Sequence, residues 1–283
     1  MEDLDRPRVV PGAAARILED LRALGLDWDE GPDIAGPHAP YTQSERSDHY
    51  QAALDRLAAS GYVFPCYCSR ADIARAAQAS ASAPHGQSDD GPRYPGTCRS
   101  LTREQIASHE RSGRRPAMRF VVEAGEVEFD DGVHGARRFD PAREVGDFVV
   151  RRADGLFAYQ LAVVVDDAAM GIEEVVRGDD LLPSTARQIL LYRALGFEVP
   201  RFAHVPLLLG PDGQRLSKRH GAISVRSFVH KGTTVERVVG MLASSLLGDT
   251  IEEASAAELV KGFELAKVGR KAVRMDPGEL AGA

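Results

Sequence analysis

The chain has 283 residues, of which 43% are hydrophobic and 27% are charged, and its formal net charge is −7 at pH 7. That length allows one sizeable core or two or three small modules. No apolar run is long enough to span a membrane and the N-terminus does not read as a signal peptide, so we expect a soluble cytoplasmic protein. The acidic balance excludes a chain that is basic throughout, so any contact with nucleic acid would come from a local basic patch.

The first half of the chain predicts two amphipathic helices and several short strands. Apolar residues at helical spacing predict helices over Pro11–Gly25 and Ser47–Ser60. A short strand is expected over Tyr62–Cys68. The Ser/Gly/Pro-rich stretch Ser80–Pro95 is expected to be mobile, and alternating apolar positions over Arg115–Phe139 predict antiparallel strands and turns.

The second half alternates predicted strands and helices. Strands are expected over Asp147–Arg152 and around Val175–Val176, and the nearly continuous apolar run Leu156–Val165 predicts a buried parallel strand. A helix is expected over Pro183–Leu195, closed by the glycine that follows it, and a small helical region from about Ile223 on. Strands that alternate with helices around an irregular middle predict an α/β, Rossmann-like nucleotide domain with an insertion.

A basic loop with flanking glycines follows one predicted strand. The segment from Val205 to Gly221 reads V-P-L-L-L-G-P-D-G-Q-R-L-S-K-R-H-G, in which Val205–Leu209 predicts a short buried strand and Gly210–Gly213 a turn. Cations and a hydroxyl on a loop at a strand end suit a polyphosphate, while a solvated basic turn is the alternative. The loop residues concerned are Arg215, Leu216, Ser217, Lys218 and Arg219.

All three cysteines of the chain fall in one segment, which indicates a metal site in a reducing compartment. Cys66 and Cys68 can grip one ion from a strand end, and Cys98, on a turn, can close the site from the far side. Three thiolates leave a tetrahedral ion one ligand short, and Tyr94 and His85 are the nearby candidates. Buried cysteines without a ligand are the alternative.

A substrate site is indicated by two polar side chains on the strands around Phe157–Asp167 and Val175–Asp180. Tyr159 at the start of one buried strand and Arg177 at the end of the next could meet over one cleft, where arginine pairs bidentately with a carboxylate. A core tyrosine and a surface arginine are the alternative. The two aspartates that end the first stretch are expected to orient the site, and His204 is interpreted as a structural histidine.

These segments together resemble the glutamyl branch of the class I aminoacyl-tRNA synthetases. Arg215 to Arg219 resembles their K-M-S-K-S loop, and F-A-Y-Q-L-A-V-V-V-D-D and V-R-G-D-D resemble two further signatures. Two more matches are E-D-L-D-R-P-R, which begins at Glu2, and Y-T-Q-S-E-R. The resemblance implies a Rossmann-like catalytic domain that binds ATP with Mg²⁺. It also implies that Lys218 stabilises charge on the ATP phosphates, that Tyr159 and Arg177 contact glutamate, and that Glu2 binds the glutamate ammonium group.

The cysteine segment resembles the zinc site of the glutamyl-queuosine tRNA(Asp) synthetase family. That family has the pattern C-x-C…Y-x-x-x-C, in which the tyrosine oxygen is the fourth ligand. The resemblance therefore implies Zn²⁺ held by Cys66, Cys68, Tyr94 and Cys98. The spacer before Tyr94 is long here, so His85 stays an alternative fourth ligand.

The resemblance also predicts how the chain is divided. We expect 1–64 to form the first part of the catalytic domain, 65–146 a zinc-containing insertion, 147–222 the second part, and 223–283 a short helical C-terminal region without an anticodon-binding domain. The family's first strand and H-I-G-H-type loop would precede Glu2, which predicts that Met1 is an internal methionine and that the enzyme is impaired without them.

The implied activity is tRNA-independent activation of glutamate to glutamyl adenylate and its transfer to queuosine in the anticodon stem-loop of tRNA(Asp), by a monomer. A truncated glutamate–tRNA ligase is one alternative. A non-catalytic, zinc-stabilised RNA- or partner-binding remnant is the other.

Overall fold

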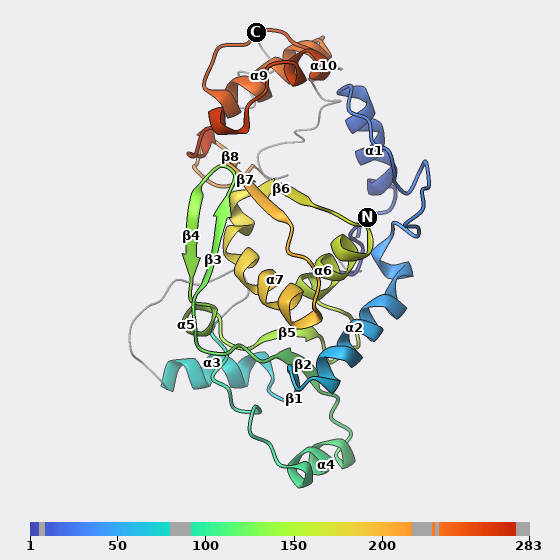
Figure 1. Ribbon diagram of the computed structural model, residues 1–283, viewed down its shortest axis with the longest axis vertical. Coiled ribbons are helices and arrows are strands. Elements are labelled where there is room, and N and C mark those ends of the chain that lie inside the picture. Colours follow the sequence, from blue (N-terminus) through green and yellow to red (C-terminus); the bar gives the residue numbers. More distant parts are fainter. Residues whose placement is uncertain (6–8, 80–91, 217–227, 230–231, 276–283) are drawn as a thin grey trace.

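The structure is a computed structural model that describes residues 1–5, 9–79, 92–216, 228–229 and 232–275 (Figure 1). The molecule is elongated, with α4 at one end, α9 and α10 at the other, and the main sheet between them. The helices are α1 (Ala13–Ala23), α2 (Ser47–Ala59), α3 (Arg70–Ala79), α4 (Arg103–Arg111), α5 (Pro141–Glu144), α6 (Tyr159–Ala169), α7 (Leu182–Leu195), α9 (Val235–Leu247) and α10 (Ala256–Val260). The strands are β1 (Val63–Cys66), β2 (Ala117–Phe120), β3 (Val127–Asp131), β4 (Gly135–Phe139), β5 (Phe148–Arg151), β6 (Glu174–Gly178), β7 (Arg201–Val205), β8 (Leu208–Leu209) and β9 (Val273–Arg274).

The main sheet has four strands in the order β4-β3-β7-β6. β7 runs parallel to both β3 and β6, while β4 returns antiparallel beside β3. The carboxyl ends of β3, β7 and β6 therefore meet at one edge of the sheet, where α/β folds bind their ligands. Together with the helices that pack against it, this sheet confirms the predicted α/β architecture.

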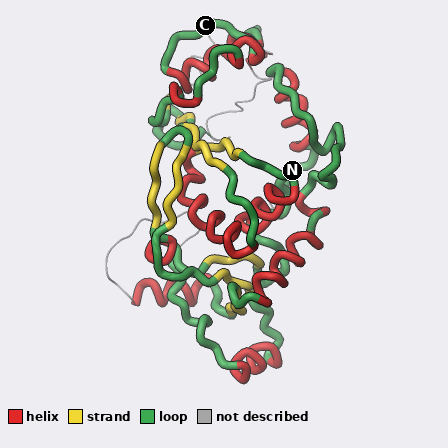
Figure 2. Tube along the Cα trace, in the orientation of Figure 1, coloured by secondary structure: helices red, strands yellow, loops and turns green. Residues whose placement is uncertain are grey.

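A second sheet of three antiparallel strands, in the order β1-β2-β5, lies between the main sheet and α4 (Figure 2). β1, which spans the boundary expected at 64/65, pairs with β2 as one continuous strand. Strand pairing also crosses the boundary expected at 146/147, since β2 pairs with β5 in this sheet and β3 pairs with β7 in the main sheet. The division of the chain into four segments stays a prediction.

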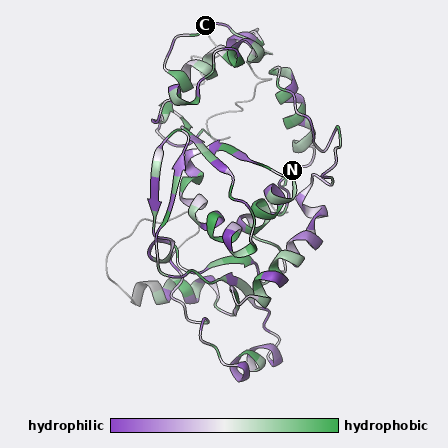
Figure 3. Ribbon diagram, viewed as in Figure 1, coloured by the Kyte–Doolittle hydropathy of each residue, from purple (hydrophilic) through white to green (hydrophobic). Residues whose placement is uncertain are grey.

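The hydrophobic core lies among α2, α6 and α7, and the elements around it are richer in hydrophobic residues than α4 (Figure 3). The helix predicted over Ser47–Ser60 is confirmed, and its apolar residues at helical spacing, Tyr50, Ala53, Leu54 and Leu57, are all buried. The predicted α7 ends at Gly196, whose φ of 63° is the left-handed conformation that glycine adopts without strain.

The strand predicted over Leu156–Val165 is wrong, because its residues from Tyr159 on belong to α6. A helix buried on most sides and a buried strand both read as continuous apolar runs, so periodicity cannot separate them. α6 packs against both α2 and α7, which explains why apolar residues cover nearly its whole circumference. Tyr159 is consequently the first residue of a helix and not of a strand.

The strand predicted over Val205–Leu209 is divided in the structure. β7 ends at Val205 and β8 begins at Leu208, with Pro206 between them. Proline has no N–H group for a sheet, which accounts for the interruption. The predicted turn over Gly210–Gly213 is confirmed by the hydrogen bond from the Gly213 amide to the Gly210 carbonyl, at 2.9 Å.

The C-terminal region is helical as expected, with α9 and α10 in its described part. Thr234 begins α9 by accepting a hydrogen bond from the backbone N–H of Arg237, and Ser255 forms a capping box with Glu258 at α10. Most of the stretch expected to be mobile, residues 80–91, lies outside the described residues. No helix in the described ranges is long and apolar enough to cross a membrane.

Candidate active site

Arg177 lies near the carboxyl end of β6, at the edge of the main sheet where the parallel strands end. Its Nε donates to Nε2 of His204 on β7 at 3.0 Å, and its Nη2 donates to Oγ1 of Thr185 on α7 at 2.8 Å. The guanidinium carbon also lies 5.3 Å from the ring centroid of Phe202. Burial lowers the pKa of this half-buried arginine. None of these partners is an anion, so the site can accept one.

Tyr159 is the first residue of α6, and its side chain lies next to that of Arg177. The Arg177 side chain hydrogen-bonds its hydroxyl, and Glu2 is close enough to affect its charge. Burial raises the pKa of Tyr159, and the Glu2 carboxylate raises it further. The structure therefore brings together Tyr159, at the start of α6, and Arg177, near the end of β6.

Glu2 is brought to the site by contacts of its two neighbours with the segment Tyr41–Arg46. The Gln43 amide donates to the Met1 carbonyl at 3.0 Å, and the Ser44 amide and hydroxyl donate to the Asp3 carboxylate at 2.7 and 2.5 Å. Glu2 keeps exposed surface, while partial burial of its carboxyl group raises its pKa against the influence of the N-terminus.

Asp166 anchors that segment to α6. Its carboxylate accepts from Nε of Arg46 at 2.6 Å, from Nε2 of Gln43 at 3.1 Å and from the Tyr50 hydroxyl at 2.9 Å. The expectation that Asp166 orients the site agrees with these contacts, because through Gln43 it fixes the backbone that holds residues 1–3.

Asp167, the next residue, has a raised pKa. Burial raises its pKa to about 6, opposed by the hydrogen bond that it accepts from the Tyr192 hydroxyl at 3.1 Å. Asp166 and Glu2 raise the pKa further, whereas Arg177 lowers it. Three carboxyl groups, a guanidinium and a phenol thus share one electrostatic environment, which suits a ligand that carries both an ammonium and a carboxylate group.

The basic loop begins next to this site. Arg215 forms an ion pair with Asp180, just beyond β6, and the Leu216 amide donates to the Leu208 carbonyl at 3.2 Å. Ser217, Lys218 and Arg219 lie outside the described residues, so their predicted contacts with ATP phosphates stay predictions.

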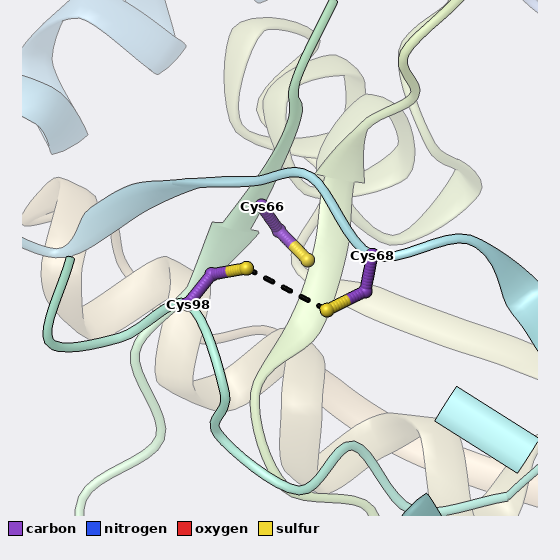
Figure 4. A group of neighbouring side chains, drawn as sticks. All are labelled: Cys66, Cys68 and Cys98. Carbon is purple, nitrogen blue, oxygen red and sulfur yellow. Dashed lines mark hydrogen bonds between the residues drawn. The ribbon is translucent and has the colours of Figure 1, made fainter. Parts of the chain in front are cut away.

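The three cysteines converge at the end of β1 (Figure 4). The Sγ atoms of Cys66, Cys68 and Cys98 all lie within 4.8 Å of one another, and those of Cys68 and Cys98 are 3.5 Å apart. Sulfur ligands around a tetrahedral zinc ion, with bonds of about 2.3 Å, are separated by about 3.8 Å. The cluster could therefore hold such an ion after small movements.

Tyr94 lies beside the same cluster. Its oxygen is 3.4 Å from Sγ of Cys66 and accepts the backbone N–H of Cys98 at 2.8 Å. Burial raises the pKa of Tyr94, and it raises the pKa of Cys68 to about 12. A metal ion would have to displace these protons, so metal affinity should rise with pH. His85 lies outside the described residues.

Three residues around Arg177 were not predicted as parts of the site. Thr185, His204 and Asp131 are fully or almost fully buried. The sequence does contain a signal that could have identified Asp131. Val127, Phe129 and Asp131 occupy every second position of β3, so Asp131 shares the inward face of the two apolar residues. A carboxylate on a core-facing position requires a buried partner. His204 does have partners, as predicted, but one of them is the site residue Arg177.

Comparisons with known proteins agree with this geometry. The family model for the class I tRNA synthetases (E and Q), catalytic domain, matches residues 1–276. Relatives named Glutamyl-Q tRNA(Asp) synthetase from Symbiobacterium thermophilum and Nitratidesulfovibrio vulgaris are 54% and 51% identical. The alignments cover 99% and 86% of this chain and 86% and 74% of those proteins.

One similar solved structure is a glutamate tRNA ligase from Elizabethkingia meningosepticum in complex with its amino acid. It has a TM-score of 0.82 and 28% sequence identity, and the match covers 99% of this chain and 60% of that one. This chain therefore spans less than two thirds of that ligase.

Proposed function

Because the chain belongs to the class I tRNA synthetases of the E and Q type, we propose that it activates glutamate with ATP and transfers the glutamyl group to queuosine in the anticodon of tRNA(Asp). The acceptor follows from the names of relatives more than half identical to this chain. It is a ligase-type enzyme in this proposal, and ATP with Mg²⁺ is its second substrate.

The half-buried guanidinium of Arg177 carries the proposal. Its described hydrogen-bond partners are uncharged, so a carboxylate can pair with it without displacing an anion of the protein. Tyr159 and Arg177 would hold the side-chain carboxylate of glutamate, and Glu2 would receive its ammonium group. The nearby Asp167 adds negative charge on the ammonium side once it is ionised.

The reaction would need little chemistry from the protein beyond positioning and charge stabilisation. An oxygen of the glutamate α-carboxylate attacks the α-phosphorus of ATP, the bond to the bridging oxygen breaks, and pyrophosphate leaves. Lys218 of the basic loop would stabilise the phosphate charge. A nucleophile on queuosine then attacks the glutamyl carbonyl carbon, and AMP leaves.

A zinc ion held by Cys66, Cys68, Cys98 and Tyr94 would support this site from the second sheet. The converging sulfur atoms and the adjacent tyrosine oxygen support that ligand set. The ion would be structural, because four protein ligands leave no position for a substrate.

The test is glutamate-dependent ATP–pyrophosphate exchange without tRNA. Arg177→Ala should raise the glutamate KM about 30-fold or more, the equivalent of roughly 2 kcal/mol or above for a buried charge pair, and leave the ATP KM nearly unchanged. Arg201→Ala is the matched control, because that arginine is on the neighbouring strand with its side chain 71% exposed. Absence of glutamate-dependent exchange would contradict the proposal.

The acceptor is tested separately with labelled glutamate and tRNA(Asp) that either contains or lacks queuosine. Label should appear only on the queuosine-containing tRNA. Exchange that strictly requires tRNA, with label on the tRNA 3′ end, would instead indicate a glutamate–tRNA ligase.

A further inference from the structure

Arg177 is held by the register of two parallel strands. Arg177 of β6 is the direct partner of His204 of β7, and paired residues of neighbouring strands project from the same face of the sheet. The Nε–Nε2 contact of 3.0 Å follows from this pairing. Thr185 completes the arrangement from α7, since its Oγ1 lies 2.8 Å from Nη2 of Arg177 and 3.1 Å from Nε2 of His204.

His204 is held in turn by Asp131 at the end of β3. Both side chains are fully buried, and Nδ1 of His204 lies 2.6 Å from Oδ2 of Asp131. The other oxygen, Oδ1, accepts the backbone N–H groups of Val133, His134 and His204 at 3.0, 2.9 and 3.2 Å. A carboxylate that accepts so many hydrogen bonds is stable in its ionised form, and the pKa of Asp131 is lowered accordingly, against the effect of burial.

The position of each proton on His204 follows from its two partners. Arginine has only N–H donors, so Nε2 of His204 must accept from Arg177 and carries no proton. The ionised Asp131 accepts only, so Nδ1 carries the proton. A ring with an accepting Nε2 is neutral, and burial, reinforced by the Arg177 charge, lowers the pKa of His204 against the hydrogen bond to Asp131, which raises it.

We propose that Asp131 and His204 are positioning residues that hold Arg177 in its glutamate-binding orientation, with His204 fixed as the neutral Nδ1–H tautomer. The glutamate part of this inference rests on the proposed function. With Nε and one Nη2 hydrogen used by the protein, the remaining N–H groups of Arg177 are left for Tyr159 and the substrate carboxylate. An arginine fixed in this way loses less conformational freedom when it binds its ligand.

Asp131→Asn tests the tautomer with almost no change of shape. The amide oxygen can still accept the three backbone N–H groups, while the amide nitrogen donates to Nδ1 of His204. The histidine proton must then move to Nε2, where it points at the Nε–H of Arg177. Calorimetry on the full chain should show glutamate bound about 10- to 100-fold more weakly, the cost of one hydrogen bond to a charged group.

His204→Gln is the conservative partner variant, because a glutamine oxygen can replace Nε2 as the acceptor for Arg177. It should bind glutamate within a few-fold of the parent chain, whereas His204→Leu should match or exceed the loss of Asp131→Asn. Thr185→Ser keeps the hydroxyl and is the matched control for Thr185→Val. Melting temperatures of all variants separate loss of folding from loss of orientation, and Asp131→Asn keeps the test valid if a histidine variant does not fold.

The tautomer has its own readout in ¹⁵N NMR spectra of histidine, with the His204 signals identified by their absence in His204→Gln. The parent chain should show a proton on Nδ1 alone at pH 7, and Asp131→Asn a proton on Nε2. A proton on Nε2 of the parent chain at pH 7 would overturn the assignment. Glutamate affinity within two-fold of the parent, in a folded Asp131→Asn with the moved proton, would overturn the positioning role. A parent chain that does not bind glutamate would instead refute the proposed function.

Discussion

Removal of the Asp166 carboxylate should destabilise the whole chain, because it leaves a buried cation without its anion. The side chain of Arg46 is 2% exposed and that of Asp166 11% exposed, with Nε and Oδ1 2.6 Å apart. In the described part of the chain, the other hydrogen-bond partners of Arg46 are the carbonyls of His38 and Pro40 and the Tyr50 side chain, none of which is an anion. Removing one partner of such a pair costs about 3–5 kcal/mol, and we expect this loss for Asp166→Ala.

Urea unfolding followed by circular dichroism measures this loss. With a slope of about 3 kcal/mol/M, the midpoint should fall by about 1–2 M. Glu174→Ala is the control, because it removes an exposed ion pair with Arg201 in which N and O are 3.5 Å apart, and such pairs contribute about 1 kcal/mol or less. Asp166→Ala should also weaken glutamate binding, since Gln43 would hold Glu2 less firmly.

The double variant Arg46→Met, Asp166→Leu separates the cost of an unpaired charge from loss of packing. Replacing both charges by apolar groups of similar volume is often neutral, but Gln43 and Tyr50 lose their acceptor in this variant. Stability should therefore rise above that of Asp166→Ala without reaching that of the parent chain. A loss for Asp166→Ala no larger than that for Glu174→Ala would refute the reasoning that the Arg46 charge is buried and uncompensated.

Three further predictions concern the cysteine cluster, Asp167 and the basic loop. Purified protein should contain one zinc ion per chain, and metal analysis should show its loss in Cys98→Ser and in Tyr94→Phe; loss in His85→Ala with retention in Tyr94→Phe would replace the fourth ligand. The pKa of Asp167 is raised to about 6 in the folded state, so the folded state binds this proton more tightly than the unfolded state does. Protonation of Asp167 therefore stabilises the fold at low pH, and this stabilisation is lost as the pH rises through about 6. Asp167→Asn should therefore raise the melting temperature more at pH 8 than at pH 5, and equal gains would contradict this sign. Lys218→Ala should lower kcat for pyrophosphate exchange about 10²–10³-fold with little change in the ATP KM, whereas Arg215→Lys should be mild; exchange at the parent rate in Lys218→Ala would leave the loop without a role at the phosphates.

Local sequence was sufficient wherever a short segment specifies its own structure. The helical spacing of α2, the glycine after α7 and the turn at Gly210–Gly213 were all predictable, because caps, turns and amphipathic faces depend on residues a few positions apart. The family signatures selected Arg177, Tyr159 and Glu2, which the structure brings close together, and the cysteine spacing selected three residues that form one cluster.

Tertiary packing decided what local patterns leave open. Residues of α6 read equally well as a buried strand, and only their burial between α2 and α7 makes them a helix. Asp131 and His204 are far apart in sequence, and the order β3-β7-β6 is what aligns them behind Arg177. Which strands become neighbours depends on how the whole sheet is buried. This information is spread over the chain and cannot be read from any one segment.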